Sequence, residues 1–188
     1  MKRVVVFFSI LIIVSGMSFA LDFTKLPSSV QPGNLLISAG FNSGSAKFSS
    51  SGWGGGESFG IFGATLALDY FLGKYCFSVG GELGYIGGNS YNWGFGAVPV
   101  LGRLGYHPDL GVNNLDIYGL LKLGFAMGIG EDEKAFGFGI GFGLGGRYFF
   151  TNKFGVFTEL GFERYSFAIE GGDIKFTKYF TIGATYKM

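Results

Sequence analysis

Residues 136–150 read Phe136-Gly-Phe-Gly-Ile-Gly-Phe-Gly-Leu-Gly-Gly-Arg-Tyr-Phe-Phe150, and this segment indicates the fold most clearly. Large apolar residues alternate with glycines, and a period of two is the period of a β-strand. Over residues 136–148 one face is apolar, whereas the other carries glycines and Arg147. A soluble sheet places its large residues inside and its polar residues in water. We therefore expect the apolar face to meet lipid and the small, charged face to line a narrow barrel.

The N-terminus has the three parts of a secretory signal peptide. Lys2 and Arg3 are positive, Val4–Val14 is an apolar core, and Ser18-Phe19-Ala20 places small residues where a signal peptidase reads them. We expect residues 1–20 to be removed after export. The alternative is an N-terminal anchor helix, but the apolar core is short compared with the roughly 20 residues of a membrane span.

The remaining chain has the composition of one exported domain. Residues 21–33 are expected to form a periplasmic N-terminal segment, and residues 34–188 the barrel. Without the two signal charges, 12 basic and 13 acidic residues remain, so no surface for nucleic acid is implied. Cys76 is the only cysteine, which excludes an internal disulfide and a thiolate metal cluster. The sequence gives no indication of a cofactor or a bound metal.

The alternation continues in eight segments of roughly the length that a tilted membrane strand needs. They are Asn34–Phe41, Phe59–Phe71, Tyr75–Ile86, Trp93–Tyr106, Leu115–Ile129, Phe136–Phe150, Phe154–Tyr165 and Ile174–Lys187. In the fourth segment the pattern shifts phase near Pro99, so we expect a β-bulge there, because proline cannot donate to a ladder. An even number of strands suits a closed barrel with both ends on one side. The predicted fold is an all-β, eight-stranded antiparallel up-and-down transmembrane β-barrel.

The connections divide into two sets, one at each end of the predicted barrel. If the N-terminus lies in the periplasm, the extracellular set comprises Asn42–Ser58, Gly87–Asn92, Gly130–Ala135 and Glu170–Asp173. The first of these is the only long loop, and it is rich in serine and glycine. Long surface loops commonly carry binding functions.

Aromatic residues gather beside both sets of connections. Rings with polar tips favour the headgroup zone of a bilayer, so two outward girdles are expected. The predicted girdle residues are Tyr70, Tyr75, Tyr85, Trp93, Tyr106, Tyr148, Phe154 and Tyr186, with Phe41, Phe136 and Phe176 also near the outer rim.

Charged side chains on the inward faces form the candidate site. They are Asp69, Glu82, Arg103, Asp116, Lys122, Arg147 and Glu159. A buried charge must be paired or hydrated, since an isolated one costs several kcal/mol. The set is therefore either a salt-bridge network that plugs the lumen or a gate within a narrow hydrated path.

The mature chain resembles the small eight-stranded outer-membrane barrels of the OmpA, OmpX and OmpW type. The resemblance rests on the signal peptide, the eight amphipathic strands, the short turns and a closing strand that alternates as Phe180-x-Ile182-x-Ala184-x-Tyr186-x-Met188. It implies a monomer in the lipid of the bacterial outer membrane, delivered by periplasmic chaperones. It also implies that the barrel-assembly machinery reads Phe180, Ile182, Tyr186 and Met188, where Met188 replaces the usual terminal aromatic residue.

Three functions compete at this point. The first is a non-enzymatic outer-membrane barrel with a structural or narrow-channel role, since eight strands leave room for little more than side chains. The second is an adhesin or binding protein that acts through residues 42–58. The third is a soluble lipocalin-like carrier, which would need apolar residues inside and polar ones outside.

No enzyme is expected from the sequence. Gly141-x-Gly-x-x-Gly146 matches a dinucleotide fingerprint, but strand alternation runs straight through it, where the motif needs a turn and a helix. His107 is the only histidine, and a His-Pro-Asp turn accounts for it. The sequence reveals no nucleophile–base constellation.

Overall fold

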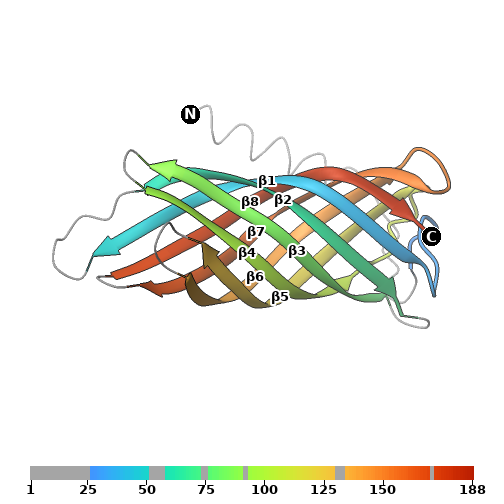
Figure 1. Ribbon diagram of the computed structural model, residues 1–188. Coiled ribbons are helices and arrows are strands. Elements are labelled where there is room, and N and C mark those ends of the chain that lie inside the picture. Colours follow the sequence, from blue (N-terminus) through green and yellow to red (C-terminus); the bar gives the residue numbers. More distant parts are fainter. Residues whose placement is uncertain (1–25, 51–57, 73–75, 91–92, 130–133, 170–171) are drawn as a thin grey trace, which may run out of the picture.

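The chain forms a closed β-barrel of eight strands, seen in a computed structural model that describes residues 26–50, 58–72, 76–90, 93–129, 134–169 and 172–188 (Figure 1). The strands are β1 (Leu35–Ser50), β2 (Ser58–Phe71), β3 (Phe77–Ser90), β4 (Trp93–Tyr106), β5 (Leu115–Ile129), β6 (Lys134–Phe149), β7 (Phe154–Ile169) and β8 (Gly172–Lys187). Each strand pairs antiparallel with the next, and β8 pairs with β1 to close the barrel. The part of the chain described here contains no helix long and apolar enough to cross a bilayer.

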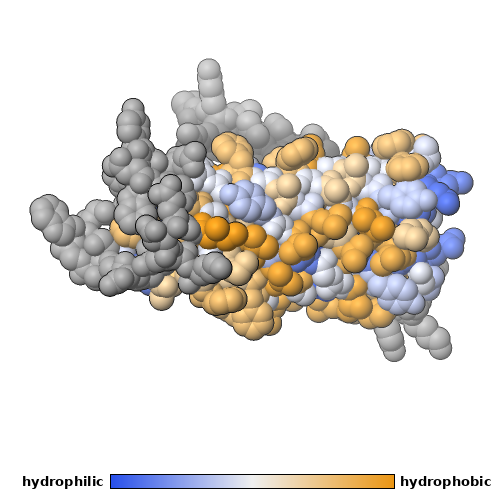
Figure 2. All heavy atoms as spheres, in the orientation of Figure 1, coloured by the Kyte–Doolittle hydropathy of each residue, from blue (hydrophilic) through white to orange (hydrophobic). Residues whose placement is uncertain are grey.

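The two faces of the wall have the polarity predicted from the alternation. Leu121, Leu123, Phe138 and Phe142 are 51–62% exposed on the outside, although they are among the most apolar residues of the chain. Figure 2 shows such apolar residues across the middle of the barrel wall. Nine charged side chains are buried inside, so the soluble lipocalin-like carrier, which needs the opposite polarity, is excluded.

Several strands extend beyond their predicted ends on the side away from the termini. The loop predicted over residues 42–58 is wrong for residues 42–50, which belong to β1. Residues 42–47 pair with both β2 and β8, and residues 48–50 pair with β8. Asn42 and Ala46 are buried inside, while Lys47 is exposed outside. The serine- and glycine-rich composition hides this alternation, and only pairing with two neighbours satisfies the backbone as a strand. Residues 51–57 lie outside the described part of the chain.

The predicted bulge at Pro99 is absent. Pairing of β4 with β5 continues through Pro99 opposite Ala126 in an unbroken register. Pairing with β3 pauses between Leu83–Val100 and Ile86–Ala97 and then resumes in the same register. The missing proline N–H is accommodated by this gap, so no extra residue is inserted.

The irregularity lies instead in β8. Its register with β1 shifts between Ser43 and Gly44, so that Phe180 and Lys178 face consecutive residues of β1 and Tyr179 is the extra residue. The register of β7 with β8 shifts at the same level. A bulge of one residue reverses which side chains face the interior. As a result Phe176, predicted for the outer rim, is buried inside the barrel, and Lys178 also points inward.

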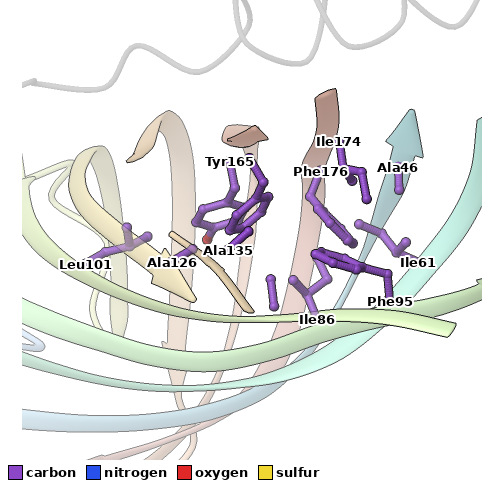
Figure 3. Packing of buried hydrophobic residues seen from close by; sticks show 12 residues of the cluster. Ala46, Ile61, Ile86, Phe95, Leu101, Ala126, Ala135, Tyr165, Ile174 and Phe176 are labelled. Carbon is purple, nitrogen blue, oxygen red and sulfur yellow. The ribbon is translucent and has the colours of Figure 1, made fainter. Parts of the chain in front are cut away.

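Two apolar clusters fill the two ends of the lumen. Away from the termini, Phe95, Phe167 and Phe176 pack with smaller apolar residues, and their ring centroids are 5.5–5.9 Å apart (Figure 3). At the end that holds the C-terminus, Val30 of the segment before β1 packs against Leu36, Phe71 and Phe149. The backbone of this segment is tied to the barrel by Gly33 N–H, which donates to Phe71 O at 3.0 Å.

Candidate functional site: the lumen charge network

A single row of cross-strand partners brings most of the charged residues together. Moving from strand to strand through paired residues, the row contains Asp69, Gly80, Arg103, Lys122, Gly141, Glu163 and Lys178. Partners directly opposite each other on one face of a sheet are close neighbours. The register therefore places acids and bases along one continuous row of the inner wall, with two glycines among them.

The two glycines leave the space that the long side chains occupy. A Cβ atom added to Gly80 would lie 1.9 Å from the backbone oxygen of Leu68 and 2.9 Å from Oδ1 of Asp69. One added to Gly141 would lie 3.0 Å from Cγ of Glu163. Gly145, on β6, has the ring of Tyr118 lying directly over its Cα. The glycine alternation in β6 thus makes room for charged and aromatic neighbours from the flanking strands.

Arg103 is the centre of the network. Its Nε lies 3.0 Å from Oδ1 of Asp69, its Nη1 lies 2.5 Å from Oε2 of Glu82, and its Nη2 lies 2.7 Å from Oε1 of Glu159. The Arg103 side chain is only 1% exposed. Three carboxylates therefore share the fork of one guanidinium, which offers five N–H donors in a fixed plane.

Two lysines form the ion pairs on the side of the network that is farther from the termini. Lys122 Nζ lies 2.6 Å from Glu82 and 3.0 Å from both Glu159 and Glu163. Lys178 Nζ lies 2.5 Å from Glu82 and 2.7 Å from Glu163. Each lysine thus contacts at least two carboxylates, and Glu82 accepts from three cations.

Arg147 forms the ion pairs on the side of the network that is nearer the termini. It contacts Asp69 through Nη2 and lies 3.1 Å from Oδ2 of Asp116 through Nη1. Its guanidinium also lies 4.2 Å from the ring centroid of Tyr118, which is a cation–π distance. The Tyr118 hydroxyl donates to Oε1 of Glu159 at 3.2 Å and so connects the two sides of the network.

His107 is part of this interior, contrary to the expectation of a simple turn residue. Its Nε2 lies 2.8 Å from Oγ of Ser78, and its Nδ1 lies 2.8 Å from Oδ1 of Asp116. This is the order of a serine–histidine–aspartate triad. All three residues are fully buried, and the ring of Phe71 lies 4.6 Å from that of His107. Sequence reasoning missed the grouping because Ser78, His107 and Asp116 come from three different parts of the chain.

The structure brings all seven charged residues of the predicted set into one buried network. It adds Glu163 and Lys178, so that five carboxylates meet four Lys and Arg cations. Glu163 has the same alternation as Glu159 and could have been included from the sequence. Lys178 could not, because only the bulge in β8 turns it inward. Among the described residues no cluster of His, Cys, Asp and Glu is placed to hold a metal ion.

The predicted girdle residues lie on the outer wall where the structure describes them. Tyr70, Tyr85, Tyr148 and Phe154 are 47–53% exposed. Tyr106 and Tyr186 are half-buried, each against a neighbouring phenylalanine: the Phe77–Tyr106 and Phe154–Tyr186 ring centroids are 5.1 and 4.8 Å apart. Tyr75 and the side chain of Trp93 lie outside the described part.

In the closing strand, Ile182 and Met188 are exposed on the outer face, and Phe180 and Tyr186 are half-buried there. Their recognition by the assembly machinery stays a prediction.

A closed barrel with an apolar outer wall and an ionised, buried interior is an integral membrane β-barrel. The chain belongs to the outer membrane protein beta-barrel domain family, which its sequence matches over residues 8–187. It is a bacterial outer-membrane protein, and its apolar wall is the surface that contacts lipid.

Solved structures of similar fold are outer-membrane barrels. Neisserial surface protein A is 14% identical with a TM-score of 0.62, covering 83% of this chain and 99% of its own. Ail, the attachment invasion locus protein of Yersinia pestis, is 15% identical with a TM-score of 0.50, covering 84% of this chain and 100% of its own. At these identities the likeness concerns the fold alone. A comparison with curated proteins gave no match.

Proposed function

We propose that the protein is a non-enzymatic structural barrel of the outer membrane whose lumen is sealed. The observation that supports this proposal is the layered interior, in which the charge network lies between two apolar clusters. An ion that crosses the lumen would have to pass both apolar clusters and separate ion pairs that are almost fully buried. Each of these steps costs several kcal/mol in a low-dielectric interior.

The ion pairs of the network favour a closed, packed lumen over a path for ions. Every cation in it contacts at least two carboxylates, and the Arg147 and Asp116 side chains are 0% exposed. A conducting path needs sites that an ion can enter and leave, with water or weak ligands along the wall. Here the carboxylates are already occupied by lysine and arginine side chains, so the lumen offers few free ligands to a passing ion.

The competing roles find less support in the geometry. Ser78 lies in a triad order, but its side chain and that of His107 are fully buried, so a substrate would have to displace the packed end of the barrel. A binding role through residues 42–58 loses much of its basis because residues 42–50 form part of β1. The sealed structural barrel is therefore the function that we propose.

Single-channel recording tests this proposal. The refolded parent protein and the Lys122→Ala variant are both expected to give no steady conductance, because the apolar clusters still close the lumen when one cation is lost. Lys153→Ala, in an exposed turn, is the matched control, and a general porin in the same bilayer shows that the recording works. Heat-modifiable gel mobility establishes that each variant has folded.

Two results would contradict a sealed lumen. Steady current steps from the folded parent protein would show that ions cross it. Steps that appear or change size only in Lys122→Ala would favour a gate within a hydrated path.

A further inference from the structure

The outer wall carries a basic patch formed by Lys47 on β1, Arg164 on β7 and Lys175 on β8. Each of the three residues lies between inward-facing neighbours on its strand, so each side chain is on the outside of the barrel. Asp173 is the one acidic residue among the described outward positions of β7, β8 and β1. The outer face of these three strands therefore has a clear excess of positive charge at this level.

Lys47 and Lys175 are directly opposite each other in the β1–β8 pairing. Like charges in this position repel and destabilise a sheet. Arg164 is paired with Thr177, two residues from Lys175 on the same face, so it is a diagonal neighbour of that lysine. No ion pair within the described residues neutralises any of the three, and the buried Nε of Arg164 has no hydrogen-bond partner. Asp173 is two residues from Lys175 on the same face, but in the described part of the chain it forms no ion pair with any of the three cations. The patch therefore keeps an excess of positive charge, which points to an anionic ligand.

The height of the patch identifies the source of that anion. Lys47 lies twelve residues beyond the start of β1, and Arg164 lies ten residues beyond the start of β7. At about 3.3 Å per residue along a strand tilted by about 40°, these positions are about 30 and 25 Å above the strand starts. The apolar band of an outer-membrane barrel is about 25 Å tall. The patch is therefore at the level of the lipid headgroups, at the end of the barrel away from the C-terminus (Figure 1).

The outward residues along the same strands agree with this level. Below the patch they are apolar: Phe41 is 75% exposed, Leu160 60% and Ile182 51%. Around it they are polar, and the hydroxyls of Ser45 and Tyr179 are hydrogen-bonded at 3.1 Å. The transition from apolar to polar and basic side chains is the boundary between acyl chains and headgroups.

We propose that Lys47, Arg164 and Lys175 bind the phosphate groups of a phosphorylated glycolipid, of the lipid A class, in the outer leaflet. An even-stranded barrel inserted from the periplasm keeps both termini there, so the end away from the termini faces the outer leaflet. Arginine and lysine both bind phosphate, arginine through two parallel N–H donors. The inference is independent of whether the lumen is sealed, because it concerns only the outer wall.

Binding of lipid A in mixed detergent micelles tests the site. The parent protein is compared with the Lys47→Gln/Arg164→Gln/Lys175→Gln variant, using lipid A with two phosphates and a dephosphorylated form of the same lipid. Each lost charge is expected to weaken binding of the phosphorylated lipid about fivefold, and the triple variant about a hundredfold. The matched control Lys153→Gln removes a cation at the opposite end of the barrel and is expected to leave the affinity unchanged. The difference between parent and triple variant should shrink as salt is added.

Thermal unfolding without lipid A separates binding from folding. Because the triple variant removes the repulsion between Lys47 and Lys175, its midpoint in plain detergent is expected to equal or exceed that of the parent. Added lipid A should then stabilise the parent more than the variant. Equal affinity of parent and variant, or equal binding of the dephosphorylated lipid, would overturn the proposal. Stronger binding of a soluble sulfated oligosaccharide than of lipid A would also overturn the proposal, because the patch would then be a glycan-binding site.

Discussion

Arg103 provides the sharpest test of the lumen network, because it contacts three carboxylates from three strands. Replacing it with methionine keeps much of the side-chain volume but removes the charge. Removing one partner of a buried ion pair costs about 3–5 kcal/mol, since the other partner remains buried and uncompensated. Asp69 keeps Arg147, and Glu159 keeps Lys122, so we expect the lower end of this range, about 3 kcal/mol.

Urea unfolding in lipid vesicles, followed by heat-modifiable mobility, measures this loss. With a slope of about 2 kcal/mol per molar urea, the midpoint of Arg103→Met should fall by about 1.5 M. Adding Glu159→Gln removes one of the carboxylates left without their guanidinium, so the double variant should regain a large part of the stability. Lys153→Met, in an exposed turn, is the control and should stay within about 0.5 kcal/mol of the parent. The reasoning is refuted if Arg103→Met is as stable as the parent, or if the two substitutions destabilise additively.

Two further predictions concern the two faces of the wall. Gly145→Ala would force a methyl group into the ring of Tyr118 and should cost about 1–3 kcal/mol in urea unfolding. Gly119→Ala, where an added Cβ meets nothing within 4 Å, should change stability by less than about 0.5 kcal/mol; equal effects would mean that the interior is not closely packed. Leu123→Arg, on the lipid-facing side, should destabilise the folded barrel by about 2–4 kcal/mol and reduce the heat-modifiable fraction. Asn152→Arg, in an exposed turn, should not, and comparable losses from both would indicate a general effect of added charge.

The barrel, its eight strands and the polarity of its wall could all be predicted from the amino-acid sequence. These features follow from a period of two that can be read within each strand, as in residues 136–144, where every second residue is large and apolar. The same local pattern also predicted that Glu82, Lys122 and Glu159 face inward. No knowledge of strand partners was needed for these conclusions, because the alternation is a property of each segment alone.

The contacts between charged residues and the packing at the two ends of the lumen could not be predicted, because they depend on how the strands pair. The ion pairs of Arg103 depend on the register of several strands, and a register is set by contacts between segments that are far apart in the sequence. The inward position of Lys178 depends on the bulge at Tyr179, where the register of β8 shifts against both β1 and β7. His107 joins Ser78 and Asp116 for the same reason: their proximity comes from the closure of the barrel and has no counterpart in the local pattern.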